Sequence, residues 1–453
     1  MNTEDTIVAL ATPPGIGAIG VLRLSGAQAI PITQKIFKGK DLSQVASHTL
    51  HYGTIMSDEK VIDEVVVSVF KGPNSYTRED VIEISCHGSP YILQQVIKLL
   101  LQHGARLAKA GEYTLRAFVN GRFDLAQAEA VADLITSENE SMHKAAMNQM
   151  RGGFSAEIKA LREELVHFAS MIELELDFSE EDVEFASRDE LKNLIQNLQQ
   201  LITKLTESFS MGNAIKNGIP TVIAGKPNAG KSTLLNGLLN EEKAIVSEIP
   251  GTTRDIIEDV IHIDGMGFRF IDTAGIRTTE DHVEAIGVER AHAKMKEAAV
   301  IIYLIDLKND NETDIRNQLV FLKDLAIPYL LIGNKSDQAK KEVLDALEGT
   351  DFIRITAHKK ENLETVKEAL KEKASLKDFK AGNTLVTTLR HYESLIETNK
   401  SLDKVIEGID SEVTNDFLAL DIRNALLHLG EITGEITTDD LLDNIFSKFC
   451  IGK

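Results

Sequence analysis

The sequence is short of cysteine and has no long apolar segment. Its 453 residues include two cysteines, Cys86 and Cys450, which cannot build a disulfide framework and so favour a reducing compartment. No apolar run approaches the roughly 18 to 20 residues that span a bilayer, and residues 1–5 lack the basic charge of a secretory signal. These absences predict a cytoplasmic protein without a membrane anchor.

Basic side chains are also scarce. The chain carries 49 Lys and Arg against 70 Asp and Glu, a formal net charge of −21. Such a balance argues against non-specific adhesion to nucleic acid or to anionic lipid. Any RNA must therefore be held by a local patch or by a basic partner. At 43% hydrophobic and 26% charged residues the composition is globular, and the length suits about three domains.

Residues 1–118 are predicted to form a strand-rich α/β domain, with strand-like runs near residues 6–11, 19–24, 64–70 and 81–85. Gly15–Gly20 formally matches GxGxxG. A dinucleotide-binding fingerprint must open a helix, whereas the residues that follow alternate and then turn. We therefore interpret this segment as a turn rather than a dinucleotide site.

Helical periodicity dominates residues 119–216 and returns in residues 378–453, where Phe417, Leu420 and Leu427 are among the recurring apolar positions. The acidic run at residues 173–184 is more simply a solvated surface than a cation site. Between these segments, residues 217–377 alternate strands with helices, which predicts a mostly parallel, doubly wound sheet. The order suggests an α/β domain inserted into a helical domain.

The stretch Gly225-Lys-Pro-Asn-Ala-Gly-Lys-Ser232 lies between an apolar strand and a helix. A GxxxxGK[ST] loop in that context wraps backbone N–H groups around phosphates at a helix N-terminus. Lys231 would reach the β- and γ-phosphates, and the Ser232 hydroxyl would bind Mg²⁺. The alternative is a chance glycine-rich turn, so the downstream motifs have to decide.

Four further motifs expected of a GTPase follow this loop in the chain. Asp272-Thr-Ala-Gly275 comes after a strand, where Asp272 would hold Mg²⁺ through water and the Gly275 N–H would meet the γ-phosphate. Asn334-Lys-Ser-Asp337 offers a carboxylate to the N1–H and exocyclic amine of guanine, which adenine lacks. Thr356-Ala-His358 would add backbone contacts to the base. In Gly251-Thr-Thr-Arg-Asp255, Thr253 is placed to contact Mg²⁺ and the γ-phosphate.

These motifs resemble those of translation-factor-like GTPases, and the wider chain resembles the MnmE (TrmE) family of tRNA modification GTPases. The blocks that carry the narrower resemblance are Pro250-Gly-Thr-Thr-Arg-Asp255, Ala11-Thr-Pro-Pro-Gly15, Gly72-Pro-Asn-Ser75, Asp124-Leu-Ala-Gln-Ala-Glu-Ala130 and Phe449-Cys-Ile-Gly-Lys453. The resemblance implies an N-terminal folate-binding, dimer-forming α/β domain, and a helical domain made of two segments with a P-loop G domain between them. It also implies a homodimer that forms a heterotetramer with the FAD-dependent MnmG (GidA) and modifies C5 of the tRNA wobble uridine, with tRNA held mainly through the complex.

The resemblance assigns roles in hydrolysis that the residues alone leave open. Ile276 stands where Ras-like switches place a water-orienting glutamine, and the resemblance gives that role to Glu284, one of several acids nearby. It also implies K⁺ bound by Asn228, Ser247, Ile249 and Thr252, Mg²⁺ held by Ser232 and Thr253, and hydrolysis activated when G domains dimerise. The catalytic residues it implies are Glu284, Lys231, Thr253, Gly275 and Cys450. The GTP/GDP site it implies comprises Asn228, Ala229, Gly230, Lys231, Ser232, Thr233, Ser247, Ile249, Gly251, Thr252, Thr253, Asp272, Thr273, Ala274, Gly275, Asn334, Lys335, Asp337, Thr356, Ala357 and His358.

By the same resemblance, 5-formyl- or methylene-tetrahydrofolate would contact Arg23, Glu79, Arg122 and Lys453. Cationic groups suit the carboxylates of its glutamate tail. Cys450 is a candidate chemical participant, although a free cysteine is more often a small buried hydrophobe. Arg122, Ser247, Thr356 and His358 depart from the residues common in the family, without breaking a motif.

An alternative is a GTP-dependent ribosome-assembly factor of the Era or Der type. The central motifs do not exclude it, but the chain lacks a basic KH-like tail and carries the Cys-Ile-Gly-Lys terminus. A dynamin-like membrane GTPase would need a basic amphipathic or apolar anchor, and none is visible.

Overall fold

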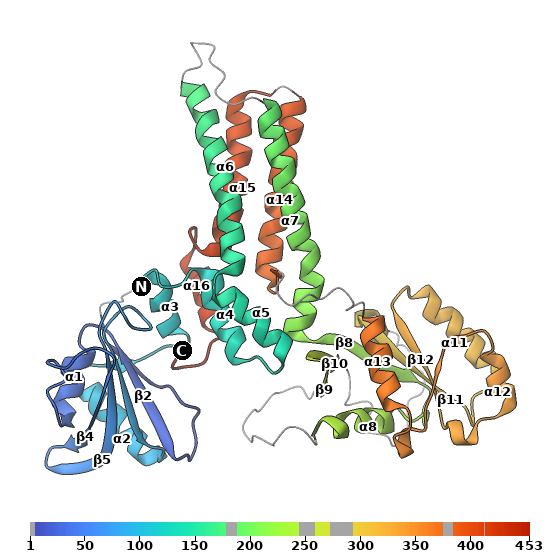
Figure 1. Cartoon of the computed structure of the whole chain (residues 1–453), viewed down its shortest axis with the longest axis horizontal. Helices are drawn as coiled ribbons and strands as arrows, with labels where there is room; N and C mark the ends of the chain where they lie inside the picture. Colours follow the sequence, from blue (N-terminus) through green and yellow to red (C-terminus); the bar gives the residue numbers. More distant parts are fainter. Residues whose placement is uncertain (1–4, 178–187, 244–258, 272–292, 375–383, 412) are drawn as a thin grey trace. The chain divides into compact units, whose positions relative to one another are not determined.

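The computed structural model describes residues 5–177, 188–243, 259–271, 293–374, 384–411 and 413–453 (Figure 1). The chain divides into two compact units. Unit 1 comprises residues 1–136, 146–202 and 393–453, and unit 2 comprises residues 137–145 and 203–392.

The N-terminal part of unit 1 is a mixed sheet with helical residues packed on both of its faces. Its elements are β1 (Ile7–Leu10), β2 (Ile19–Ser25), α1 (Ala29–Ile36), β3 (Phe37–Lys38), β4 (Thr49–Ser57), β5 (Lys60–Phe70), β6 (Val81–His87), α2 (Pro90–Gln102), β7 (Arg106–Leu107) and α3 (Glu112–Val119). The strand order is β3-β4-β5-β6-β2-β1-β7. Alternating apolar residues of the central strands pack with α1 and α2 into one core, as period-two patterning predicts.

The GxGxxG segment leads into β2, whose residues 19–25 pair with β6 in an antiparallel register. No helix begins there. The interpretation of Gly15–Gly20 as a turn rather than a dinucleotide fingerprint is therefore correct.

The remainder of unit 1 is helical. The helices are α4 (Leu125–Ile135), α5 (Glu140–Met150), α6 (Gly153–Asp177), α7 (Arg188–Asn217), α14 (Leu389–Asp410), α15 (Asn415–Thr433) and α16 (Asp439–Phe446), of which α5, α7 and α14 also contribute residues to unit 2. Helix α4 begins with a capping box, in which Asp124 and Gln127 satisfy each other's backbone N–H groups. The early part of the acidic run makes intramolecular contacts, because Glu173 accepts hydrogen bonds from Arg423.

Helix α15 is where sequence periodicity predicts a helix but misleads about its buried face. Phe417 is 59% exposed, Leu420 54% and Leu427 39%. The buried side of the helix is made instead by the intervening residues, including Leu418 and Ile422. The sequence offers two apolar stripes, and packing selects one of them.

Unit 2 is built around a second sheet. Its elements are β8 (Ile219–Gly225), α8 (Lys231–Lys243), β9 (Asp259–Ile263), β10 (Met266–Phe270), β11 (Val300–Asp306), α11 (Glu312–Asp324), β12 (Tyr329–Asn334), η1 (Ser336–Gln338), α12 (Lys341–Ala346), β13 (Ile353–Arg354), η2 (Ala357–Lys359) and α13 (Leu363–Lys373). The order is β13-β12-β11-β8-β10-β9, and every pair is parallel except β9 with β10.

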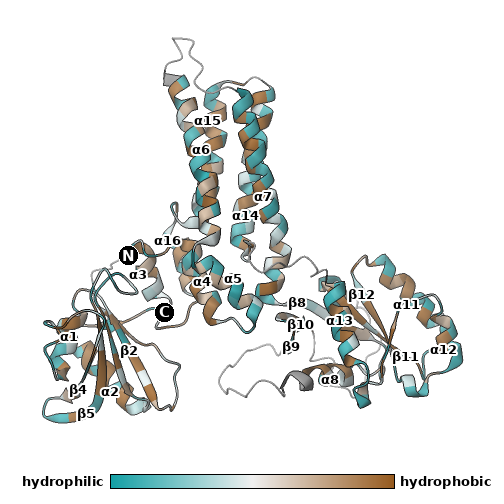
Figure 2. Cartoon of the chain, viewed as in Figure 1, coloured by the Kyte–Doolittle hydropathy of each residue, from teal (hydrophilic) through white to brown (hydrophobic). Residues whose placement is uncertain are grey.

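Two apolar clusters cover the two faces of this sheet. Helices α8 and α13 pack on one face, and α11 and α12 pack on the other. Figure 2 shows hydrophobic residues concentrated along β11, which is buried throughout its length. The prediction of a mostly parallel, doubly wound sheet is therefore correct.

The predicted fold class is confirmed: a mixed α/β domain, a helical domain and a P-loop G-type α/β domain are present. The domain boundaries at residues 118, 216 and 377 stay predictions. Among the described residues, none of the helices combines the length and apolar character that a membrane crossing requires.

Candidate functional site

The loop between β8 and α8 has the backbone shape of a phosphate-binding loop. Gly225, Asn228 and Gly230 all have positive φ, at 144°, 63° and 100°. A Cβ on Gly230 would lie 2.2 Å from Nδ2 of Asn334, and one on Gly225 would lie 2.5 Å from the Leu304 carbonyl oxygen. Only glycine fits these two positions, because the loop backbone packs directly against neighbouring strands.

Lys231, at the first turn of α8, folds back over this loop. Its Nζ donates to the carbonyl oxygens of Gly225 at 2.7 Å and Lys226 at 2.9 Å. Burial lowers the pKa of the Lys231 ammonium. Negatively charged phosphate oxygens beside this ammonium would offset the cost of burying its charge. The loop together with Lys231 therefore fits a polyphosphate. Ser232 and Thr233 follow in the same turn of the helix.

Asn334, at the end of β12, links three of the predicted motifs. Its buried side chain donates from Nδ2 to the carbonyl oxygen of Ala229 at 2.8 Å. Its Oδ1 accepts from the N–H of Lys335 at 2.8 Å and from the N–H of Ala357 at 3.1 Å. One amide therefore joins the phosphate loop, the Asn-Lys-Ser-Asp motif and the Thr-Ala-His loop.

The predicted base-recognition residues lie together beside this junction. Ser336 Oγ and Thr356 Oγ1 are 2.9 Å apart, which ties the two loops to each other. The Asp337 carboxylate lies 3.1 Å from Lys359 Nζ, and the hydrogen bond from that lysine lowers the pKa of Asp337. An ionised Asp337 can only accept, as recognition of the guanine N1–H and amine requires. His358 is exposed beside it.

Several predicted site residues lie outside the described part of the chain, so their placement stays a prediction. They are Ser247, Ile249, Gly251, Thr252, Thr253, Asp272, Thr273, Ala274, Gly275 and Glu284.

A second candidate site lies in the N-terminal part of unit 1, around Tyr76. The guanidinium carbon of Arg23 lies 5.5 Å from the centroid of the Tyr76 ring, and that of Arg122 lies 5.2 Å from it. Arg23 is also held by Glu83 on the neighbouring strand, with Nε 2.8 Å from Oε1. The structure therefore brings together two of the predicted folate-binding residues on one aromatic ring.

The chain terminus docks beside these residues. Arg23 donates to the carbonyl oxygen of Gly452 at 3.4 Å, and the Tyr113 N–H donates to the carbonyl oxygen of Lys453 at 3.2 Å. Ile451 forms an isolated antiparallel bridge with Ala110. The terminal segment is thus fixed against the loop before α3, with the Cys450 side chain exposed.

Glu79, the remaining predicted folate contact, takes part in an ion-pair network around the buried Arg116. It accepts from Ser25 Oγ at 2.6 Å and from Arg116 at 3.2 Å. Arg116, 1% exposed, also pairs with Asp5 and Glu112. Burial alone would raise the pKa of Glu112, but hydrogen bonds from Arg106 and from the backbone lower it overall.

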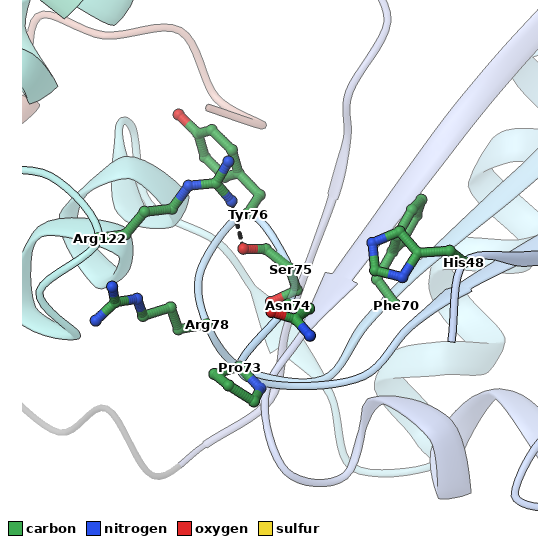
Figure 3. Close-up of a pocket in the computed structure, with 8 residues that line it drawn as sticks. All are labelled: His48, Phe70, Pro73, Asn74, Ser75, Tyr76, Arg78 and Arg122. Carbon is green, nitrogen blue, oxygen red and sulfur yellow. Dashed lines mark hydrogen bonds between the residues drawn. The ribbon is translucent and has the colours of Figure 1, made fainter. Parts of the chain in front are cut away.

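An open pocket of about 480 Å³ lies next to this region (Figure 3). Arg122 lines it and donates to the carbonyl oxygen of Ser75, while Arg23, Glu79 and Lys453 are not among its lining residues. The remaining wall is formed by His48, Phe70, Pro73, Asn74, Tyr76 and Arg78. Aromatic rings with two guanidinium groups suit a flat heterocycle that carries carboxylates.

Sequence reasoning missed several residues that build these sites. Asp306 lies beside the phosphate loop, Asp310 pairs with Lys226 of that loop, and Tyr76 and Arg116 contact the predicted residues of the N-terminal site. The signal available for Asp306 is its position at the carboxyl end of an apolar strand, where parallel sheets gather functional residues. Little in the local sequence distinguishes Arg116, because only Glu112 among these partners is near it in the chain, whereas Asp5 and Glu79 are distant.

Comparisons with known proteins agree across the whole chain. The family model described as "GTP-binding protein TrmE N-terminus" matches residues 6–122, and "MnmE helical domain" matches residues 125–450. The tRNA modification GTPase MnmE of Cytophaga hutchinsonii is 59% identical, covering 100% of this chain and 98% of the relative. Proteins of the same description from Christiangramia forsetii and Bacteroides thetaiotaomicron are 51% and 50% identical and cover 100% and 99% of this chain, and each is matched over 100% of its own length. The predicted resemblance is confirmed: the chain belongs to the MnmE family of tRNA modification GTPases.

Proposed function

We propose that this protein hydrolyses GTP and, together with the FAD-dependent MnmG, modifies C5 of the tRNA wobble uridine with an aminomethyl-type group. The observation that carries the GTPase part is the Asn334 amide, which joins the phosphate loop to both base-recognition loops. Membership of the family supports the tRNA part. A ribosome-assembly factor of the Era or Der type receives no comparable support.

The described residues would act mainly by binding and orienting the nucleotide. Lys231 would place its ammonium on the β- and γ-phosphates, and the Ser232 hydroxyl would hold Mg²⁺, which neutralises phosphate charge when bound. Asp337 would accept from guanine and reject adenine. Thr253, Asp272 with Thr273 and Ala274, Gly275 and Glu284 would complete the site, Glu284 by orienting the attacking water.

We further propose that hydrolysis depends on K⁺ and on the meeting of two G domains. Two observations support this proposal. Asn228 lies in the phosphate loop with a left-handed backbone conformation, and position 276 holds isoleucine rather than glutamine. K⁺ held by Asn228, with Ser247, Ile249 and Thr252, would stabilise developing charge as a guanidinium does.

The K⁺ dependence is tested by hydrolysis rates in KCl and NaCl at matched ionic strength. We expect a much faster rate in KCl, and loss of that difference in Asn228→Ala with GDP still bound. Equal rates in the two salts would contradict the K⁺ assignment while leaving GTP hydrolysis itself intact.

In the N-terminal part, we propose that a formyl- or methylene-tetrahydrofolate binds near Tyr76 and supplies the one-carbon unit. Arg23, Arg122 and Lys453 would hold its carboxylates, and Glu79 would support the site through its contacts with Ser25 and Arg116. Fluorescence titration with 5-formyltetrahydrofolate should show saturable binding that Arg122→Ala weakens at least about tenfold. Unchanged affinity would contradict this placement.

Cys450 is proposed as a chemical participant because its thiol is exposed on a segment that is otherwise fixed to the domain. The expected behaviour of Cys450→Ser is normal GTP hydrolysis with loss of tRNA modification. Normal modification by this variant would remove Cys450 from the chemistry.

A homodimer formed through the N-terminal sheet is supported by the exposed face of β4 and β5. Leu50 and Tyr52 on β4 are 70% and 67% exposed, and Val66 on β5 faces the same side next to Tyr52. Two copies would cover these side chains. Sedimentation should give a dimer for the wild-type chain and a monomer for Tyr52→Asp, and an unchanged dimer would refute this face.

We place the dimer in the cytoplasm, where it would form a heterotetramer with MnmG. The heterotetramer would hold much of the tRNA, because this chain is strongly acidic.

The whole proposal is tested by mass analysis of wobble uridines in cells that lack the gene. We expect the C5-substituted nucleosides to disappear and to return with the wild-type gene but not with Lys231→Ala. Unchanged nucleosides after deletion would refute the function in tRNA modification, whereas GTP hydrolysis would be untouched by that result.

A further inference from the structure

A buried aspartate at the end of β11 makes hydrogen bonds with both of its carboxylate oxygens. Asp306 is 4% exposed. Its Oδ1 accepts from the backbone N–H groups of Lys308 at 3.0 Å and Asn309 at 3.2 Å, which shapes the turn that follows. Its Oδ2 accepts from Asn309 Nδ2 at 2.9 Å and from Lys335 Nζ at 2.6 Å. One oxygen therefore binds the backbone of the turn, and the other binds both the Asn309 side chain and a lysine of the base-recognition motif.

The lysine held by Asp306 reaches the phosphate loop. Lys335 Nζ donates to the carbonyl oxygen of Asn228 at 2.9 Å. Asn228 is in the left-handed region, with φ of 63°, and so this bond fixes a residue whose conformation few side chains adopt. The contacts form an unbroken series from Asp306 through Lys335 to the inner residue of the loop.

The same turn contacts the phosphate loop at a second point. Asp310 Oδ2 accepts from the N–H of Asp306 at 2.8 Å, while its Oδ1 lies 3.2 Å from Lys226 Nζ. Lys226 also pairs with Asp314. Asp306 therefore contacts both residues that connect this turn to the phosphate loop. Its carboxylate accepts from Lys335, which reaches Asn228, and its N–H donates to Asp310, which pairs with Lys226.

Charge favours this arrangement. Burial alone would raise the pKa of Asp306, but hydrogen bonds from Lys335 and Asn309 outweigh it and lower the pKa overall. The carboxylate is therefore anionic opposite the ammonium of Lys335, at the separation of a charge-assisted hydrogen bond.

We propose that Asp306 is a positioning residue for guanine nucleotide binding: it holds Lys335 against the Asn228 carbonyl and so shapes the phosphate loop before the ligand arrives. The proposal rests on the proposed GTP site and adds a residue to it. The competing role is purely structural, in which Asp306 only caps its own turn.

Asp306→Asn separates these two roles. The asparagine keeps an oxygen for the backbone N–H groups of Lys308 and Asn309, but it presents an amide NH₂ to the Lys335 ammonium and to the Asn309 side chain. The link to Lys335 is lost, while the backbone contacts of the turn remain. We expect the Kd for a fluorescent GDP analogue to rise about tenfold, the effect of losing one charge-assisted hydrogen bond. Glu312→Gln is the matched control, because Glu312 is exposed at the start of α11 and pairs only with Arg316 among the ion pairs described. Its Kd should equal that of the wild-type chain.

A double-mutant cycle with Lys335→Met gives a readout that a structural role would not produce. If Asp306 acts through Lys335, adding Asp306→Asn to Lys335→Met should change the Kd little further. Additive effects, or an Asp306→Asn variant that binds GDP like Glu312→Gln, would overturn the proposal. Thermal unfolding reports whether each variant folds. Should Asp306→Asn fail to fold, Asp306→Ser, whose hydroxyl can cap the turn, carries the same expectations.

The outcome is separable from that of the proposed function. A wild-type chain that binds no GDP would overturn the GTP site and this role together. A wild-type chain that binds GDP, with unchanged affinity in Asp306→Asn, would overturn only the role of Asp306.

Discussion

Substituting Gly452 tests whether the terminal segment is held as the structure shows. Gly452 has φ of 98°, and a Cβ there would lie 2.4 Å from the carbonyl oxygen of Leu10 and 3.2 Å from Cα of Ala11. Both neighbours are backbone atoms that cannot rotate away. Gly104 is the matched control, because its φ is 107° and a Cβ there would have nothing within 4 Å.

The two substitutions share the backbone strain of an L-residue at positive φ, which costs about 1 to 3 kcal/mol. Gly452→Ala adds a clash that only release of the terminal segment relieves. Release would break the hydrogen bonds that Gly452, Lys453 and Cys450 accept from Arg23, Tyr113 and Gly111. At about 0.5 to 1.5 kcal/mol for each hydrogen bond, release costs roughly 2 to 4 kcal/mol. The free-energy cost of releasing the segment is therefore similar to the cost of the backbone strain alone, and lower than the cost of strain and clash together.

The assay is removal of Lys453 by a carboxypeptidase specific for basic residues, followed by mass spectrometry. We expect Gly452→Ala to lose Lys453 at least about tenfold faster than the wild-type chain, since a 1.4 kcal/mol change in docking alters the exposed population tenfold. Gly104→Ala should lose it at the wild-type rate although its thermal midpoint falls. Equal cleavage rates in all three proteins would refute the docking of the terminus.

Three further predictions concern titration and reactivity. Burial raises the pKa of the Cys86 thiol to about 12, whereas Cys450 is exposed. Iodoacetamide at pH 8 should therefore modify Cys450 and leave Cys86 unmodified in the folded chain, as peptide mapping would show. Modification of both cysteines would contradict the burial of Cys86. Hydrogen bonds from Arg106 and Arg116 lower the pKa of Asp5 in the folded state, despite some burial. The stability that this carboxylate contributes should therefore be present above its unfolded pKa near 3.8 and be lost as pH falls through the lower folded value. A thermal midpoint that rises as the pH is lowered from 5 to 2.5 would contradict this prediction. Burial lowers the pKa of Lys231, and the negative charge of a bound phosphate should raise that pKa again. Binding of GDP near pH 9.5 should therefore take up protons, which calorimetry in two buffers of different ionisation enthalpy measures. Release of protons would contradict a contact between Lys231 and the phosphates.

The local parts of the fold follow from the sequence because their causes are local. The glycines of the phosphate loop, at positive φ, mark a conformation that other residues seldom adopt, and β8 and α8 flank the loop as predicted. Asn334 also lies at a strand end, as predicted, and its part in base recognition stays a prediction. Its link to Ala229, however, depends on how β8 and β12 stand in the sheet, with β11 between them.

The rest depends on contacts that sequence spacing does not reveal. Periodicity identifies α15 but offers Phe417 and Leu420 as readily as Leu418 and Ile422, and only packing buries the second pair. The bridge between Ala110 and Ile451 joins distant parts of the chain through two residues without a repeating pattern. Asp306 ends an apolar run, and its role emerges only when Lys335 is placed beside it.

The central claim is that guanine recognition by this chain drives tRNA modification, and changing the base that is recognised tests it most directly. In Asp337→Asn the side-chain amide can donate to the 2-oxo group of xanthine but no longer accepts from the guanine amine. Modification of tRNA is measured by mass spectrometry in a mixture of this chain, MnmG, tRNA, a folate, ammonium or glycine as the source of the amine, and one nucleotide. We predict that the wild-type chain modifies tRNA with GTP, whereas Asp337→Asn requires xanthosine triphosphate. Undiminished modification by Asp337→Asn with GTP would contradict the account.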